Sequence, residues 1–175
     1  MFLVPQQQPV PPRPSDFAGI VREHQSMVFS IGWQFLRNRA LAEEIAQDVF
    51  LQLHRNLPSI ESGAHLTNWL RRVTSQRCID ALRRTRLRPQ IGLDDTAELS
   101  AASEERDPLA AGRLDRLIAT LPERARMIVI LRYQEEMEPA EIAETLAIPV
   151  GTVKSNLHRS IALLRGRMEK KRAAL

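Results

Sequence analysis

Apolar residues recur every three to four positions through most of this chain, which is the spacing of the buried face of an α-helix. In the first half this spacing predicts helices over about residues 16–36, Ala40–Asn56 and His65–Arg84, with a turn at Pro58–Gly63. No stretch shows the period of two that a strand requires, so we predict an all-α fold. The core-facing residues expected in the second and third helices are Ile45, Val49, Phe50, Leu53, Leu66, Trp69, Leu70 and Val73.

A second helical block is expected from about residue 113. Pro122 opens one helix of this block, and residues 141–164 then show two short helical patterns separated by a break at Ile148 and Pro149. Two helices joined by a tight turn are the layout of a helix-turn-helix DNA reader, and short donors with cations suit phosphate oxygens and base edges. An ordinary helical hairpin with a solvated polar face has the same pattern. The polar face of the last helix holds Thr152, Lys154, Ser155, Asn156, His158 and Arg159.

Two polar segments delimit the helical blocks. Residues 1–15 hold five of the 11 prolines, and we expect them to form an extended, disordered tail. Residues 94–107 hold six carboxylates against the single Arg106 and have no apolar periodicity, which predicts a flexible acidic linker over residues 89–112. The sequence therefore predicts two small helical domains, residues 16–88 and 113–175, joined by that linker.

Composition excludes several classes of function. Cys78 is the single cysteine, so neither an internal disulfide nor a cysteine-based zinc site is expected. The four histidines lack metal-ligand spacing, and no catalytic triad or glycine-rich phosphate motif is present. The sequence therefore gives no sign of a cofactor, a metal site or a small-molecule substrate. No apolar run is long enough to cross a membrane and the first residues do not resemble a signal peptide, so a cytoplasmic protein is expected.

Four separate motifs point to one family. They are Ala42–Phe50 (Ala-Glu-Glu-Ile-Ala-Gln-Asp-Val-Phe), Trp69–Arg84, Leu121–Arg124 and Ile148–Ser155. Together they make the chain resemble bacterial RNA polymerase sigma factors of the sigma-70 family, in the extracytoplasmic-function (ECF) group. The resemblance covers about residues 16–84 and 113–167, in the order that the family shows. It implies a sigma region 2 helical bundle followed by a sigma region 4 helix-turn-helix.

The resemblance also implies function, partners and sites. It implies a protein that is not itself an enzyme but binds core RNA polymerase, directs initiation at promoter DNA and helps to open the duplex. An anti-sigma factor is a possible further partner. The polymerase-binding residues that it implies are Glu44, Gln47 and Asp48. For the -10 element it implies Ser59, Ser62, Asn68, Arg71, Arg72 and Ser75, with Asn68, Arg71, Arg72 and Ser75 on one exposed helix face. For the -35 element it implies Thr152, Lys154, Ser155, His158 and Arg159.

Three positions depart from the family pattern. Gln76 and Asn156 stand where the family usually has Asn and Arg, which leaves the DNA contacts at these two positions open. Ala147 stands where the family usually has Gly, and this predicts a turn that avoids positive φ, because a Cβ is poorly tolerated there. Two other classes remain as alternatives: a stand-alone helix-turn-helix regulator that binds duplex DNA as a dimer, and a helical scaffold without a DNA role.

Overall fold

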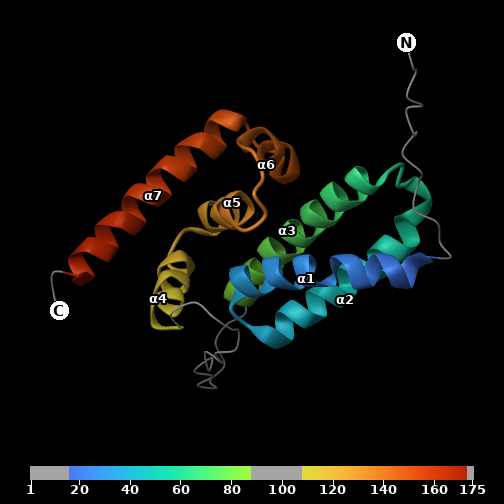
Figure 1. The fold of residues 1–175 in the computed structure, drawn as a ribbon, viewed down its shortest axis with the longest axis horizontal. Helices are drawn as coiled ribbons and strands as arrows, with labels where there is room; N and C mark the ends of the chain where they lie inside the picture. The colour runs from blue at the N-terminus through green and yellow to red at the C-terminus, as the bar shows by residue number, and fades with distance from the viewer. Residues whose placement is uncertain (1–15, 88–107, 173–175) are drawn as a thin grey trace, which may run out of the picture.

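The computed structural model describes residues 16–87 and 108–172, and all regular structure in these ranges is helical (Figure 1). This confirms the predicted all-α class. The predicted tail and most of the predicted linker lie outside the described residues. The elements are α1 (Phe17–Leu36), α2 (Arg39–Asn56), the 3-10 turn η2 (Leu57–Ser59), α3 (Gly63–Leu87), α4 (Pro108–Ala119), α5 (Glu123–Tyr133), α6 (Pro139–Leu146) and α7 (Val150–Arg172).

Helices α1, α2 and α3 pack on one another as a three-helix bundle. The stripe predicted for α2, Ile45 to Leu53, is buried as expected.

Side-chain caps fix where the helices begin. The Asn38 side chain accepts a hydrogen bond from the Leu41 amide at 3.0 Å, and the Ser62 hydroxyl accepts one from the His65 amide at 3.1 Å. Such caps satisfy amides that have no partner within the first helical turn.

Helices α4 to α7 form the second block, in which α5 is the central element. Every residue of α5 from Ala125 to Leu131 is buried, and α7 and α6 pack against it. A capping box starts α6: the Glu138 amide donates to the Glu141 carboxylate at 2.6 Å, and Pro139 takes the first helical position. Helix α4 begins at Pro108, five residues before the start predicted for the second block.

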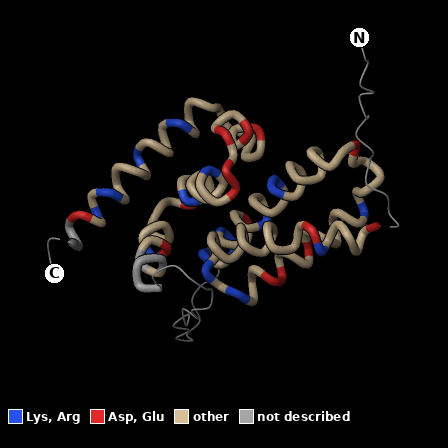
Figure 2. The backbone as a smooth tube through the Cα atoms, in the orientation of Figure 1, with Lys and Arg blue, Asp and Glu red and all other residues tan. Residues whose placement is uncertain are grey.

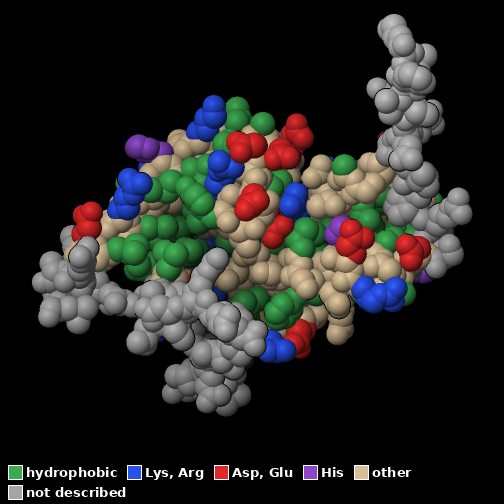
Figure 3. Space-filling model, in the orientation of Figure 1, with side chains coloured by type: hydrophobic (Ala, Val, Ile, Leu, Met, Phe, Trp, Pro, Cys, Tyr) green, Lys and Arg blue, Asp and Glu red, His purple; other side chains and the backbone are tan. Residues whose placement is uncertain are grey.

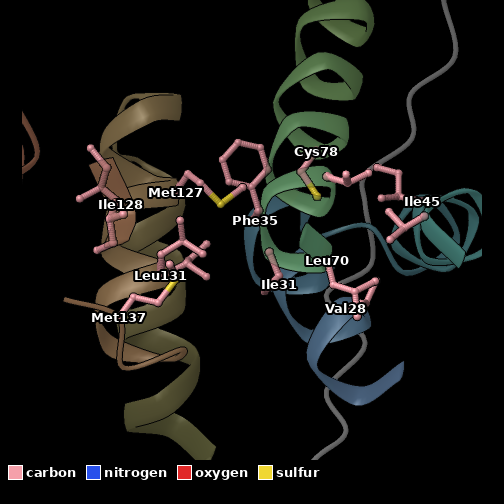
Figure 4. Close-up of a cluster of buried hydrophobic side chains, with 14 of the residues drawn as sticks. Val28, Ile31, Phe35, Ile45, Leu70, Cys78, Met127, Ile128, Leu131 and Met137 are labelled. Carbon is pink, nitrogen blue, oxygen red and sulfur yellow. The ribbon is translucent and has the colours of Figure 1, made fainter. Parts of the chain in front are cut away.

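The two helical blocks are in direct contact. Helix α5 packs against α1 and α3, and α6 packs against α3. The buried apolar side chains of both blocks form one continuous cluster. Figure 4 shows Met127 of α5 and Phe35 of α1 pointing toward one another across the junction, and both are fully buried. The sequence predicted two domains on a tether and gave no sign of this contact.

The turn between α6 and α7 corrects one prediction. Ala147 was expected to avoid positive φ, yet it adopts φ 52° and ψ 50° as the C-cap of α6. The reason is hydrogen bonding: in this conformation the Ala147 amide donates to the Glu144 carbonyl at 3.3 Å and the Ile148 amide to the Ala143 carbonyl at 3.0 Å. These bonds satisfy carbonyls at the helix end and outweigh the steric strain of a Cβ in the left-handed region.

Candidate polymerase and nucleic-acid interfaces

The exposed face of α7 is basic. Lys154, Ser155, His158 and Arg159 are exposed and Thr152 is half-buried, whereas Val153 and Leu157 are buried against the core. No carboxylate occurs between residues 150 and 168, and Figure 2 shows Lys and Arg along this helix. The Arg159 guanidinium donates to the Ser155 carbonyl at 3.2 Å, so it lies along its own helix. That bond is exposed, so the guanidinium can exchange it for a phosphate or a base edge.

Asn156, one of the departures from the family pattern, is less accessible than its exposed neighbours on α7. Its side-chain amide donates to the Thr152 carbonyl one turn earlier at 2.7 Å, and the residue is half-buried. The bond occupies one donor of Asn156 within its own helix. The most accessible candidates for DNA contact on α7 are therefore Lys154, Ser155, His158 and Arg159.

A second surface, on α2, is acidic and polar. Glu44, Gln47 and Asp48 are all exposed, at the i, i+3 and i+4 positions that share one helix face. Beside them Leu51, one turn after Gln47, is 59% exposed. Leu51 borders a groove of about 910 Å³ between α1 and α2, whose wall includes Phe17, Val21, Phe29, Ala46 and Phe50. Sequence reasoning did not single out Leu51, although its position beside the buried stripe was the available signal.

The loop before α3 holds two predicted DNA residues in local hydrogen bonds. Ser59 is exposed and its hydroxyl donates to the Asn56 carbonyl at 2.7 Å. Ser62 is half-buried because it caps α3. Ile60 is 2% exposed and fixes the loop to the bundle. These hydrogen bonds and the burial of Ile60 fix the conformation of the loop, in which the Ser59 hydroxyl is accessible.

The face predicted for α3 is only partly open. Asn68 and Arg72 are exposed, as expected. Arg71 instead pairs with Glu135 of the α5–α6 turn at 3.2 Å and donates to the Glu135 carbonyl at 3.3 Å. Ser75, one turn further along α3, is fully buried, so its predicted exposure was wrong. The physical reason is the packing of the second block on α3, a contact between distant segments that the helical period cannot reveal.

The two helical blocks that carry these surfaces match models of known protein families. The sequence matches the family model "Sigma-70 region 2" over residues 20–88 and the model "Sigma-70, region 4" over residues 111–164. It is 30% identical over 164 residues to the ECF RNA polymerase sigma factor SigW of Bacillus subtilis, covering 85% of this chain and 87% of that protein. This chain belongs to the ECF sigma factors of the sigma-70 family. The dimeric regulator and the scaffold are not favoured.

Further relatives agree with this assignment. This sigma factor is 31% identical over 128 residues to the ECF sigma factor SigF of Caulobacter vibrioides, which covers 73% of this chain and 71% of that one. Its fold resembles that of the sigma factor RpoE in a complex with the anti-sigma factor NepR from Bartonella quintana. There the TM-score is 0.73 at 17% identity, over 89% of this chain and 98% of that one. CnrH, solved with the cytosolic domain of CnrY, gives a TM-score of 0.67 at 18% identity, over 90% of each chain.

Arg126 is a buried charged residue of this sigma factor that sequence reasoning did not single out. It is 8% exposed and donates to three carbonyl oxygens: those of Phe35 at 2.9 Å, Leu121 at 3.3 Å and Ala119. Its guanidinium carbon lies 5.4 Å from the centre of the Phe35 ring. Burial, together with the nearby Arg86, lowers the pKa of Arg126, and Glu123 opposes that shift. Its position directly before the apolar run Met127–Leu131 of α5 was the available signal.

Within the described ranges, no helix of this sigma factor is long and apolar enough to cross a bilayer. No group of three or more His, Cys, Asp or Glu side chains is placed to hold a metal ion in the same part of the chain.

Proposed function

We propose that this sigma factor binds core RNA polymerase through α2, directs it to promoters with -10 and -35 elements, and assists strand opening. The observation that carries the proposal is the separation of two unlike surfaces: an acidic, polar face on region 2 and a basic, carboxylate-free helix face on region 4. A protein with both can hold a protein partner and DNA at the same time. A regulator that binds duplex DNA unaided has no need of the first surface.

The polymerase contact is assigned to Glu44, Gln47 and Asp48. Their exposure and their shared helix face support this assignment. Leu51 and the neighbouring apolar groove provide further apolar surface that would be buried when the partner docks. Charged residues at the rim of such a contact steer association and fix its register. We place the contact on a basic element of the polymerase, since two of these three side chains are anionic.

The DNA contacts are assigned to both regions. Thr152, Lys154, Ser155, His158 and Arg159 on α7 would enter the major groove at the -35 element, because a helix with short donors and cations fits that groove. In region 2, Ser59, Ser62, Asn68, Arg71 and Arg72 would act on the single-stranded -10 element. Arginines can follow phosphates there, and a loop of fixed shape can receive an unstacked base.

Regulation and location follow from the same assignment. The solved relatives were captured with an anti-sigma factor or with the cytosolic domain of CnrY. We extend an anti-sigma partner to this chain on that similarity alone. The protein would have no catalytic activity of its own, since its effect is to position polymerase, and it would act in the cytoplasm, where polymerase and the genome meet.

The test is a pair of charge reversals on exposed positions. Glu44→Lys with Asp48→Lys should abolish holoenzyme formation with core polymerase in a native gel-shift assay. The control is Glu23→Lys on the exposed side of α1, which should bind core like the wild type. Circular dichroism should show unchanged helix content in both. Undiminished core binding by the double variant would refute the assignment of α2.

A further inference from the structure

The basic face of α7 continues past the residues assigned to the -35 element. Arg165 is exposed and lies eleven residues after Lys154. At 3.6 residues per turn, eleven positions make about three whole turns, so Arg165 shares the helix face of Lys154 and His158. Figure 3 shows Lys, Arg and His side chains at the surface along the upper left of the molecule, where α7 lies in Figure 1. This face is therefore longer than the part that reads bases requires.

The Arg165 guanidinium is available to a partner. Arg165 forms no ion pair with the described side chains, whereas Arg167, two residues later, donates to the Thr120 hydroxyl beside α4. Glu169, one turn after Arg165, is exposed and is the first carboxylate of α7. Since a carboxylate repels phosphates, Glu169 limits the basic face to the residues before it.

The length of this face exceeds the width of a DNA groove. Eleven residues of α-helix span roughly 16 Å, at 1.5 Å per residue. The major groove is about 12 Å wide, and a recognition helix reads base edges with residues near its N-terminus. When Lys154 lies in the groove, Arg165 is therefore past the base edges, at the level of the sugar–phosphate backbone. A guanidinium suits that place, because its planar set of donors matches phosphate oxygens.

The direction of α7 indicates on which side of the -35 element this backbone lies. Helix α7 begins beside α6, which packs on α3, and its C-terminal end lies at the far side of the molecule from α1, α2 and α3 (Figure 1). Region 2 is assigned to the -10 element. The C-terminal half of α7 would therefore point away from the -10 element, toward the duplex upstream of the -35 element.

We propose that Arg165 contacts a backbone phosphate of the duplex directly upstream of the -35 element, outside the bases that α7 reads. This inference rests on the proposed role of α7 at the -35 element. A phosphate contact positions the helix and adds affinity, but it carries no sequence information. Arg165 would thus strengthen binding to any upstream sequence, and a duplex that ends at the edge of the -35 element would lack the contact.

Two promoter probes and two charge variants test the contact in holoenzyme assembled from core polymerase and this chain. The probes come from a promoter mapped by the 5′ ends of its transcripts and contain both elements. The short probe ends at the upstream edge of the -35 element, and the long probe continues about one helical turn further upstream. The variants are Arg165→Gln and its matched control Arg167→Gln, which removes the same charge at an exposed position on the side of α7 that faces α4. Circular dichroism should show unchanged helix content in both.

The salt dependence of binding reports the number of phosphate contacts. The logarithm of the binding constant falls with the logarithm of the salt concentration by about 0.9 for each phosphate that is neutralised. On the long probe, Arg165→Gln should reduce this slope by about 0.9, so the advantage of the wild type should shrink roughly three- to fourfold between about 50 and 200 mM salt. On the short probe Arg165→Gln should bind like the wild type, and Arg167→Gln should do so on both probes.

Each other outcome overturns a distinct part of the inference. Equal slopes for Arg165→Gln and Arg167→Gln on the long probe would overturn the phosphate contact. An equal loss by Arg165→Gln on both probes would place Arg165 within the -35 element and overturn its upstream position. If a scrambled -35 sequence leaves wild-type binding unchanged, α7 does not read that element, and the proposed function of α7 is overturned together with the role of Arg165.

Discussion

Replacing Arg126 by methionine removes the hydrogen-bond donors that hold the end of α4 and tie region 4 to α1. Methionine has similar length and fills irregular space, so the change creates little cavity. What it leaves are three carbonyl oxygens, of Phe35, Ala119 and Leu121, without the guanidinium that now serves them. The variant therefore isolates the hydrogen-bonding role of this side chain from its packing role.

The expected magnitude follows from those three acceptors. A buried polar group left without a partner costs about 1–3 kcal/mol, so three of them set an upper range of roughly 3–9 kcal/mol. Two effects oppose this loss. The buried cation is no longer desolvated, and its Nε, which has no partner, is removed. We expect a net decrease of about 3 kcal/mol in the free energy of unfolding.

Urea unfolding of the full chain, followed by circular dichroism, measures that decrease. Arg124→Met is the matched control, because Arg124 is exposed on the same helix and should change stability by less than about 0.5 kcal/mol. Arg126→Lys should lie between the two, since one ammonium group cannot reach three carbonyls with the fixed geometry of a guanidinium. If Arg126→Met and Arg124→Met unfold within about 1 kcal/mol of each other, the reasoning about buried acceptors is wrong.

Three further predictions concern single residues. Arg159→Ala should lower initiation at promoters with the preferred -35 element about tenfold, since a bidentate arginine–guanine contact discriminates by roughly 1–3 kcal/mol; equal weakening on all sequences would make Arg159 a phosphate contact. Ala147→Gly should raise the free energy of unfolding by about 1 kcal/mol because it relieves the positive φ, whereas Ala143→Gly inside α6 should lower it by a similar amount. Burial raises the pKa of the Cys78 thiol from 9.0 to about 12, so the stability present below pH 9 is lost as pH rises through that window. The advantage of the wild type over Cys78→Ala should therefore shrink by about 1.4 kcal/mol between pH 8 and pH 10 in urea unfolding, and an unchanged advantage would contradict the burial.

Local features of the fold could be predicted from the sequence. The buried stripe of α2 and the apolar face of α7 follow from helical periodicity, because each depends on residues three or four positions apart. The exposure of Glu44 and Lys154 follows from the same patterns. The burial or exposure of these residues depends on their positions within a single helix, so it can be predicted from that helix alone.

Features that depend on distant partners could not be predicted in this way. The pairing of Arg71 with Glu135 joins residues 64 positions apart, and burial of Ser75 results from the same junction. The left-handed conformation of Ala147 was missed because steric preference was weighed without the hydrogen bonds at the end of α6. In each case a tertiary or capping interaction outweighed a local preference.

Transcription from reconstituted components tests the central claim most directly. Core RNA polymerase, with and without the full chain, is given sheared DNA from the organism that encodes it, and the 5′ ends of the transcripts are mapped. The account predicts discrete start sites that appear only with the chain, each preceded by two shared sequence blocks, and their loss with Glu44→Lys and Asp48→Lys. Start sites unchanged by the chain, together with sequence-specific footprints of the chain on duplex DNA without polymerase, would contradict it.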